Sequence, residues 1–281
     1  MHTTVKPPAR AEMIKELVGS SFASRFADLA ATLETSSLAV ALVEESGNDL
    51  PRDLVVAAWT QHGNALRLAG RYAEAETTLA RAGALPSSDL PTRIHLLGVQ
   101  SSLYRNTGRF MVAETLLAKA IEAQKPLRDP AGKARLHNLL GLVYHDRGRP
   151  SEALCSFRDA LTLLGPDSPP DLLLSTGHNL FETLIVADRL EEASAVQAIL
   201  EPSYRHLTGS RIAAKAEWTR ARLCRALGQL SAARFAYGRA YEHLSREPRS
   251  PELAQLATEM EDLISASPRG RVCDGRGGLG R

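Results

Sequence analysis

Apolar residues along the chain follow the spacing of amphipathic helices, and the pattern recurs in copies. Each copy is marked by a glycine, or once by an aspartate, and the markers lie 38, 40, 40 and 40 residues apart: Gly70, Gly108, Gly148, Asp188 and Gly228. Five residues after each marker stands an alanine: Ala75, Ala113, Ala153, Ala193 and Ala233. Helices that cross at about 8–10 Å leave no room for long side chains, so a small residue at a fixed place predicts close helix packing.

Each marker is expected to end one helix and precede another, because glycine readily adopts the left-handed backbone that terminates helices. The first helices are predicted at 53–69, 90–107, 129–147, 169–187 and 207–227. The second helices are predicted at 71–85, 109–125, 149–164, 189–204 and 229–246. Proline clusters such as Pro86 to Pro91 separate the pairs, since proline disfavours helix in the residue before it. The chain is therefore expected to be a series of helical hairpins.

The two ends differ from the repeated part. Residues 1–50 predict an N-terminal helical cap, a degenerate hairpin whose two segments between Arg10 and Glu45 are broken near Gly19 to Ser21. Residues 51–246 hold the five repeats, and residues 247–266 predict a C-terminal capping helix with Leu253, Leu256, Met260 and Leu263 on one face. Residues 267–281 are rich in glycine and arginine, so we expect a disordered tail.

The repeat resembles the tetratricopeptide repeat, a helix-turn-helix hairpin that stacks into a superhelix. The first copy carries its signature residues: Trp59, Gly63, Gly70, Tyr72, Ala75, Leu79, Ala82 and Pro86. The fourth copy departs most, at Phe181, Asp188 and Gln197. The period exceeds the ~34 residues usual for the family, as in longer-period variants of bacterial regulators. The resemblance covers about Leu54 to Leu244 and implies an all-α fold, an α-α superhelix or solenoid of antiparallel hairpins.

Composition adds limits to this picture. The chain of 281 residues is 44% hydrophobic and 23% charged, as is ordinary for a soluble protein, and its net charge is only +2. No specific nucleic-acid binding is expected from so small a charge. The three cysteines are widely spaced, which fits a reducing compartment. No stretch approaches the ~18 apolar residues of a membrane span, and no secretory core begins the chain. We therefore expect a cytoplasmic protein without a membrane partner, export by another route being the alternative.

No motif in the sequence predicts catalysis. There is no H-E-x-x-H, no Walker A loop and no G-x-S-x-G elbow, and the histidines and cysteines lack zinc-ligand spacing. Gly275, Gly277 and Gly280 fit G-x-G-x-x-G, but neither a strand precedes them nor a helix follows. We expect no enzyme activity, no cofactor and no metal.

The resemblance implies that the first helix of each hairpin faces the inner surface of the superhelix, at places thirteen, ten, six and three residues before each marker. Those twenty places hold six arginines or lysines, three histidines and one acidic residue. The predicted peptide-binding groove comprises Asn64, Arg67, Arg105, Arg135, Asn138, His145, His178, Lys215, Trp218, Arg222 and Arg225.

Two interpretations of this groove stay open. Arginine forks would grip the carboxylates of an acidic peptide, with Trp218 as an anchor. Alternatively, cations three residues before a helix end, such as Arg67, simply favour the helix dipole, although Arg135 and Arg222 lie elsewhere. The carboxylate clamp of some tetratricopeptide proteins is not reproduced, since Val99 and Leu139 stand where polar residues belong.

The leading hypothesis is a non-catalytic scaffold or adaptor that binds a protein or peptide through the concave face of the solenoid. An acidic peptide is among the expected partners. The alternative is a regulatory sensor that binds a peptide or small ligand and signals to a transcriptional partner.

Overall fold

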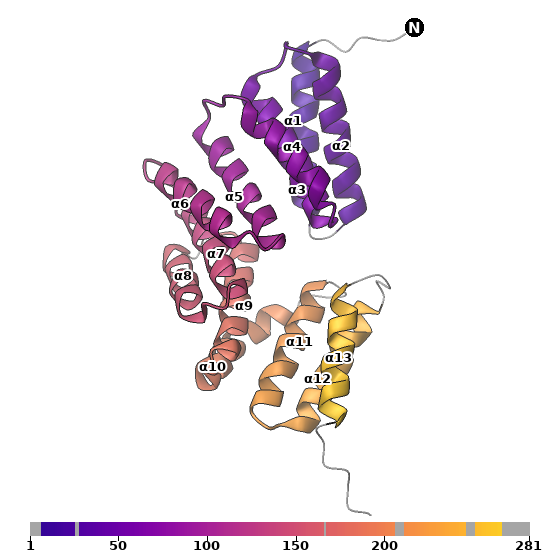
Figure 1. The fold of residues 1–281 in the computed structure, drawn as a ribbon, viewed down its shortest axis with the longest axis vertical. Helices are drawn as coiled ribbons and strands as arrows, with labels where there is room; N and C mark the ends of the chain where they lie inside the picture. The colour runs from indigo at the N-terminus through magenta and orange to yellow at the C-terminus, as the bar shows by residue number, and fades with distance from the viewer. Residues whose placement is uncertain (1–6, 26–27, 166, 206–210, 246–250, 266–281) are drawn as a thin grey trace, which may run out of the picture. The chain divides into compact units, whose positions relative to one another are not determined.

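The computed structural model describes residues 7–25, 28–165, 167–205, 211–245 and 251–265. These residues form thirteen α-helices and no strand (Figure 1). The helices before the third marker are α1 Pro7–Ser24, α2 Leu29–Ser46, α3 Arg52–Leu68, α4 Tyr72–Ala84, α5 Leu90–Asn106, α6 Phe110–Gln124 and α7 Pro130–Asp146. The later helices are α8 Pro150–Leu163, α9 Pro170–Val186, α10 Leu190–Arg205, α11 Arg211–Ala226, α12 Leu230–Leu244 and α13 Pro251–Ser265.

The chain divides into two compact units. Unit 1 spans residues 1–187 and contains α1 to α9, and unit 2 spans residues 188–281 and contains α10 to α13. The division falls at the fourth marker, Asp188, in the copy whose sequence departs most from the repeat. Whereas the sequence pattern treats residues 51–246 as one array, the contacts separate its first seven helices from its last three.

The marker residues end helices as the sequence predicts. Gly70 has φ = 74°, its N–H donates to the carbonyl of Arg67 at 3.0 Å, and the N–H of Arg71 donates to the carbonyl of Leu66 at 2.9 Å. These two bonds are those of the Schellman motif. The same pair of bonds recurs at Gly108, Gly148 and Gly228, and Asp188 has φ = 57°. Asp188 is the one non-glycine residue with positive φ in the described part of the chain. The turn is therefore a repeated unit of backbone geometry.

The predicted close approaches between helices are confirmed. All five alanines that follow the markers by five residues are completely buried. A Cβ atom added to Gly63 would come within 2.6 Å of the Leu79 side chain, and one added to Gly141 within 2.5 Å of the Phe157 ring. Phe157 is itself fully buried. The space beside the small residue on one helix is thus occupied by the large residue on the other helix of the hairpin.

In unit 1 the first helices of successive hairpins lie against one another. Contacts join α1 to α3, α3 to α5, α5 to α7 and α7 to α9, whereas no comparably close pair occurs among α2, α4, α6 and α8. Helices that approach one another more closely lie on the shorter, inner side of a curved stack. We call the surface that α1, α3, α5, α7 and α9 present the inner row.

The N-terminal hairpin forms, but its break was predicted in the wrong place. Gly19 to Ser21 lie inside α1, and the chain leaves helix only after Ser24. Ser21 is fully buried, donates to the carbonyl of Thr32 at 3.0 Å and accepts from Gln61 at 3.1 Å. The capping residue is Asp28, whose carboxylate accepts from the N–H of Ala31 at 3.0 Å. Of these small residues, Ser21 thus serves packing, whereas nothing lies within 4 Å of a Cβ atom added to Gly19. The predicted tail 267–281 lies outside the described residues.

Candidate functional site: the inner row of unit 1

Polar side chains connect successive helices of the inner row near their C-terminal ends. Three predicted groove residues make these contacts, each three residues before its marker. Arg67 donates to the amide oxygen of Asn106 on the next inner helix at 3.3 Å. Arg105 lies 3.5 Å from the carboxylate of Asp146. The Nδ1 atom of His145 lies 2.9 Å from the hydroxyl of Thr183. These residues therefore bind neighbouring hairpins together.

Amide groups continue this polar ladder. Asn64 is buried and its amide oxygen accepts from Arg67 Nε at 3.1 Å and from a terminal nitrogen at 2.9 Å. Asn138 is also buried, and its amide oxygen accepts from Asn179 at 3.0 Å. His178, another predicted groove residue, lies partly buried on α9.

A second cluster lies where the end of α1 meets the starts of α5 and α9. Arg25 donates to the carboxylate of Asp171 at 3.5 Å, across 146 positions of sequence. The Arg25 guanidinium also lies 3.8 Å from the centre of the Phe22 ring, and that ring packs edge-on against His95 with 6.1 Å between ring centres. The end of α1 therefore reaches the far end of the inner row.

Arg135 adds positive charge to this cluster. Its side chain is exposed and forms no ion pair with any residue that the structure describes. Burial, the charge of Arg135 and that of Arg25 lower the pKa of His95 to about 4. Burial also lowers the pKa of Arg25, with Asp171 raising it and Arg135 lowering it. His95 is therefore neutral at pH 7, and Asp171 is the carboxylate that pairs with Arg25.

In unit 2 the structure gives two predicted groove residues a partner on the capping helix. The carboxylate of Glu259 on α13 accepts from Trp218 Nε1 at 2.9 Å, from Arg222 at 2.6 and 3.0 Å, and from the Tyr237 hydroxyl at 3.0 Å. Trp218 is buried, and the Arg222 guanidinium lies 4.7 Å from the centre of its ring. These side chains hold α13 on unit 2, whereas Lys215 and Arg225 are exposed.

Burial would raise the pKa of Glu259, but the hydrogen bonds from Arg222, Trp218 and Tyr237 outweigh it, so that pKa lies below its ordinary value. Burial and the neighbouring Glu259 raise the pKa of Tyr237 to about 12. The pair therefore consists of an ionised carboxylate and a neutral phenol at neutral pH.

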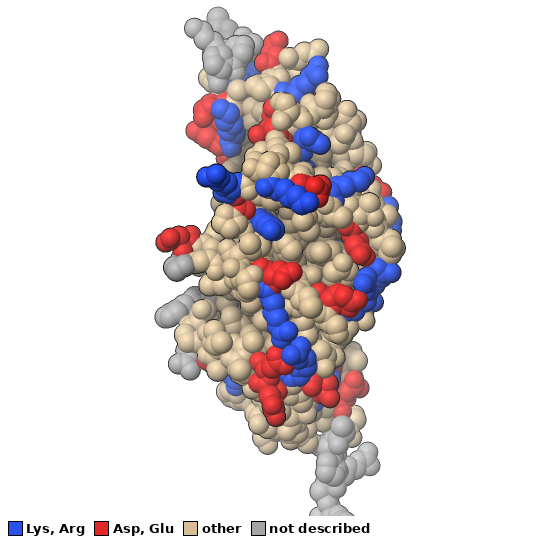
Figure 2. All heavy atoms as spheres, turned by 90° about the vertical axis from the view of Figure 1, so that its left-hand side faces the viewer, with Lys and Arg blue, Asp and Glu red and all other residues tan. Residues whose placement is uncertain are grey.

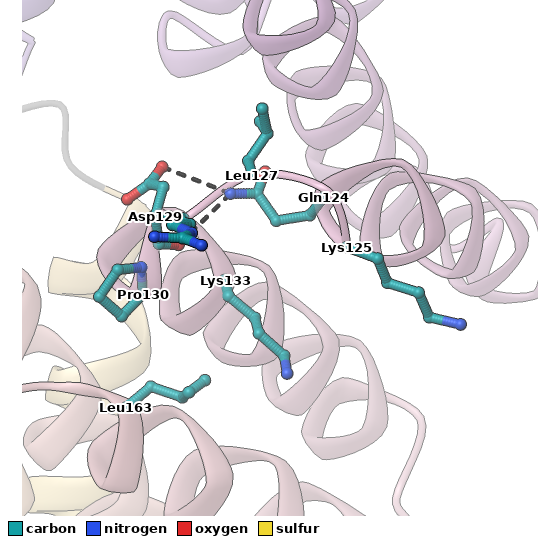
Figure 3. A pocket seen from close by; sticks show the side chains of 8 residues that line it. Gln124, Lys125, Leu127, Asp129, Pro130, Lys133 and Leu163 are labelled. Carbon is teal, nitrogen blue, oxygen red and sulfur yellow. Dashed lines mark hydrogen bonds between the residues drawn. The ribbon is translucent and has the colours of Figure 1, made fainter.

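Elsewhere on the surface, charge is mixed. Figure 2 shows one face on which Lys and Arg side chains alternate with Asp and Glu along its whole length. A hollow of about 330 Å³ lies at the α6–α7 turn, lined by Gln124, Lys125, Leu127, Arg128, Asp129, Pro130, Lys133 and Leu163 (Figure 3). Its Asp129 caps α7 by accepting from the N–H of Gly132 at 2.8 Å, and Gln124 donates to Asp129 at 3.4 Å. Asp129 and Gln124 of this hollow are therefore engaged by the turn itself.

Metal-ligating side chains are not clustered in the part of the chain that the structure describes. No three His, Cys, Asp or Glu side chains there are grouped to hold a metal ion. None of the helices in those ranges is long and apolar enough to cross a membrane.

The fold and the inner row define a class of protein, an α-solenoid built from stacked helical hairpins. Residues 95–164 match the family model described as tetratricopeptide repeat. Over these residues the chain thus carries repeats of the tetratricopeptide type. Among curated proteins, none matches its sequence.

Solved structures share this fold at low sequence identity. A Rap protein complexed with competence and sporulation factor superposes with a TM-score of 0.69 at 11% identity, over 92% of this chain and 70% of that one. BtubC from P. vanneervenii gives a TM-score of 0.57 at 14% identity, over 84% and 93% of the two chains. PilF of Pseudomonas aeruginosa gives 0.56 at 15% identity, over 89% and 99%. At such identities the likeness establishes the fold alone, an all-α stack of helical hairpins.

Sequence reasoning did not find the cluster at the end of α1, in which Phe22 and Arg25 meet Asp171 of α9. Phe22, Arg25 and Asp171 fall outside the repeat register, since two precede the first marker by more than one period and the third lies before the inner-face places of its copy. The one available signal was the pairing of an aromatic residue with arginine at Phe22 and Arg25, which no periodicity distinguishes.

Proposed function

We propose that the chain is a non-catalytic binding scaffold that holds a segment of a partner protein or a peptide against the inner row of unit 1. The observation that carries the proposal is the state of Arg135, an exposed cation beside Arg25 and His95 for which no described residue supplies a carboxylate. A guanidinium offers five N–H donors in a planar fork that suits carboxylates. An acidic segment of the partner would provide the missing acceptors.

The likeness in fold supports a bound partner of this kind. The Rap protein that superposes on most of this chain was solved with competence and sporulation factor bound. A solenoid of stacked hairpins offers an extended inner surface to such a partner.

The test is selection of binders from a random peptide display library on the full chain, followed by affinity measurement with Arg135→Glu. Charge reversal is expected to lower affinity for the selected peptides at least about tenfold, because the like charge repels an acidic segment. Lys119→Glu is the matched control, since Lys119 is exposed on α6 away from the inner row. Equal affinity of both variants, with unchanged helical content, would contradict the proposal.

A regulatory sensor is a second candidate, favoured by the Arg25–Asp171 contact. This contact joins the first and last helices of the inner row in unit 1, so a ligand entering beside Arg135 would compete with Asp171 for Arg25. If the chain is a sensor, a selected peptide should increase amide exchange at the end of α1 while decreasing it in α5 and α7. Protection restricted to α5 and α7 would favour the simple scaffold.

A further inference from the structure

Arg67 is a cation in the inner row without a carboxylate partner. Its three hydrogen bonds go to neutral amide oxygens, two to Asn64 and one to Asn106. No ion pair to Arg67 occurs among the described residues, although fourteen other pairs of a Lys or Arg with a carboxylate do lie within bonding distance. Its neighbour Arg105 carries the same charge and shares the inner row. Arg67 is partly buried, and a guanidinium withdrawn from water is normally paired with a carboxylate, because desolvating a charge is costly.

The electrostatic state of Arg67 agrees with this geometry. Burial and, to a smaller extent, the charge of Arg105 lower the pKa of Arg67, the nearby Tyr72 phenol raises it, and the resulting pKa is about 10. No carboxylate contributes to that balance. The group remains charged at pH 7, and its charge is only weakly compensated.

The side chains around Arg67 offer more hydrogen-bond donors than acceptors. A guanidinium has five N–H groups, and three of those of Arg67 are used by the two amides. Because a guanidinium only donates, both asparagines must present their oxygens to it, which leaves the amide N–H groups of Asn64 and Asn106 as donors. The buried Nε of Arg105 has no hydrogen-bond partner in the described structure, although Asp146 lies 3.5 Å away.

We propose that Arg67, Arg105, Asn64 and Asn106 form an anion subsite that takes a carboxylate of the bound acidic segment. This inference rests on the proposed binding function and adds a second contact, at the C-terminal ends of α3 and α5, to that made by Arg135 at the start of α7. A carboxylate oxygen pair accepts from a guanidinium fork and from amide donors at once. Its arrival also provides the counter-ion that the chain does not supply, so the contribution to binding is larger than at a solvated arginine.

The carboxylate has two sources in a peptide, an acidic side chain or the C-terminus. The peptides selected on the full chain are remade in three forms: with each Asp or Glu changed to its amide, with the C-terminus amidated, and with both changes. We expect one of these changes to lower affinity at least about tenfold for the native chain, since charge-assisted bonds are the stronger ones. Arg67→Gln should reduce that difference between acid and amide peptides to what the Arg135 contact alone supplies, whereas Arg67→Lys should keep a larger part of it.

Arg71→Gln is the matched control, because Arg71 is exposed, lies one residue beyond the first marker and pairs with Glu74. It should leave the preference for the acid intact. A preference for the acid that survives Arg67→Gln unchanged would overturn the inference while leaving the binding function in place. Peptides that bind with no acid preference at all would overturn both this subsite and the acidic contact at Arg135.

A direct measurement of anion binding tests the subsite without any peptide. The Nε–H signals of Arg67 and Arg105 are followed by NMR while sodium acetate or inorganic phosphate replaces chloride at constant ionic strength. We expect saturable shifts of both signals with acetate, and their loss in Arg67→Gln. A response to phosphate that exceeds the response to acetate would overturn the assignment to a carboxylate, and no saturable shift with either anion would overturn the subsite itself.

Discussion

At the scale of single residues, the fold depends on places where a side chain has no room. Gly141 and Gly63 lie on first helices against Phe157 and Leu79 of the second helices. A substituent there would meet a buried group that cannot move freely, since Phe157 is fully enclosed. The glycine is required by close approach and not by backbone conformation, because its φ is that of an ordinary helix residue.

Gly141→Ala is therefore expected to destabilise the protein by about 1–3 kcal/mol through overpacking. Thermal or urea unfolding measures the change. Gly19→Ala is the control, since nothing lies within 4 Å of the added methyl, and it should stabilise α1 by about 0.5–1 kcal/mol. A Gly141→Ala variant as stable as the native chain would show that the hairpin can accommodate the methyl group without overpacking.

His95 predicts a pH dependence of stability. Its folded pKa of about 4 lies below the ordinary value of 6.5, so between these values the unfolded chain binds more protons than the folded chain. The stability that His95 contributes is therefore present above about pH 6.5 and is lost as the pH falls toward 4.

The measurement is the unfolding midpoint of native chain and His95→Gln from pH 7.5 to pH 4.5. The variant should lose less stability over this window than the native chain does. Parallel curves would mean that His95 titrates normally in the folded protein. Histidine NMR signals give an independent check.

At the scale of elements, α13 completes unit 2 by supplying one carboxylate to three donors. The sequence predicted a capping helix within residues 247–266, because its amphipathic spacing is local, and the helix runs over Pro251–Ser265. It could not reveal that Glu259 meets Trp218, Arg222 and Tyr237. That contact joins positions up to 41 residues apart, and no periodic pattern encodes it.

Glu259→Gln is expected to destabilise unit 2 by about 1–3 kcal/mol, because Arg222 loses its counter-ion in a partly buried place. Since the folded pKa of Glu259 is lowered, its contribution is present above the unfolded pKa and is lost as the pH falls through the folded one. Glu261→Gln on the exposed side of the same helix should change stability by no more than about 0.5 kcal/mol. The difference in free energy of unfolding between the two variants, measured by chemical denaturation, gives the contribution of the Glu259 contacts.

At the scale of the whole molecule, the division at Asp188 bears on cooperativity. In stacked repeats each hairpin is stabilised by its neighbours, so a local change is felt locally. The copy around Asp188 has the weakest repeat signature, and the boundary between the two compact units falls there.

We expect Glu259→Gln to increase amide hydrogen exchange in α11 to α13 while leaving α3 to α8 unchanged. Exchange followed by mass spectrometry of peptic fragments reports both regions in one experiment. An increase of equal size along all helices would show that the chain unfolds as one cooperative body.

The sequence by itself determined the hairpins, their turns and the small residues at their crossings, because these depend on spacings of a few residues and on the left-handed backbone that glycine reaches without strain. It also placed arginines and asparagines on the inner row in unit 1. Only the tertiary structure decided which of these are engaged within the chain, as Trp218 and Arg222 are by Glu259, and which are short of an acceptor, as Arg67 and Arg135 are. Pairing between distant side chains depends on how the helices stack, and helical periodicity does not contain that information.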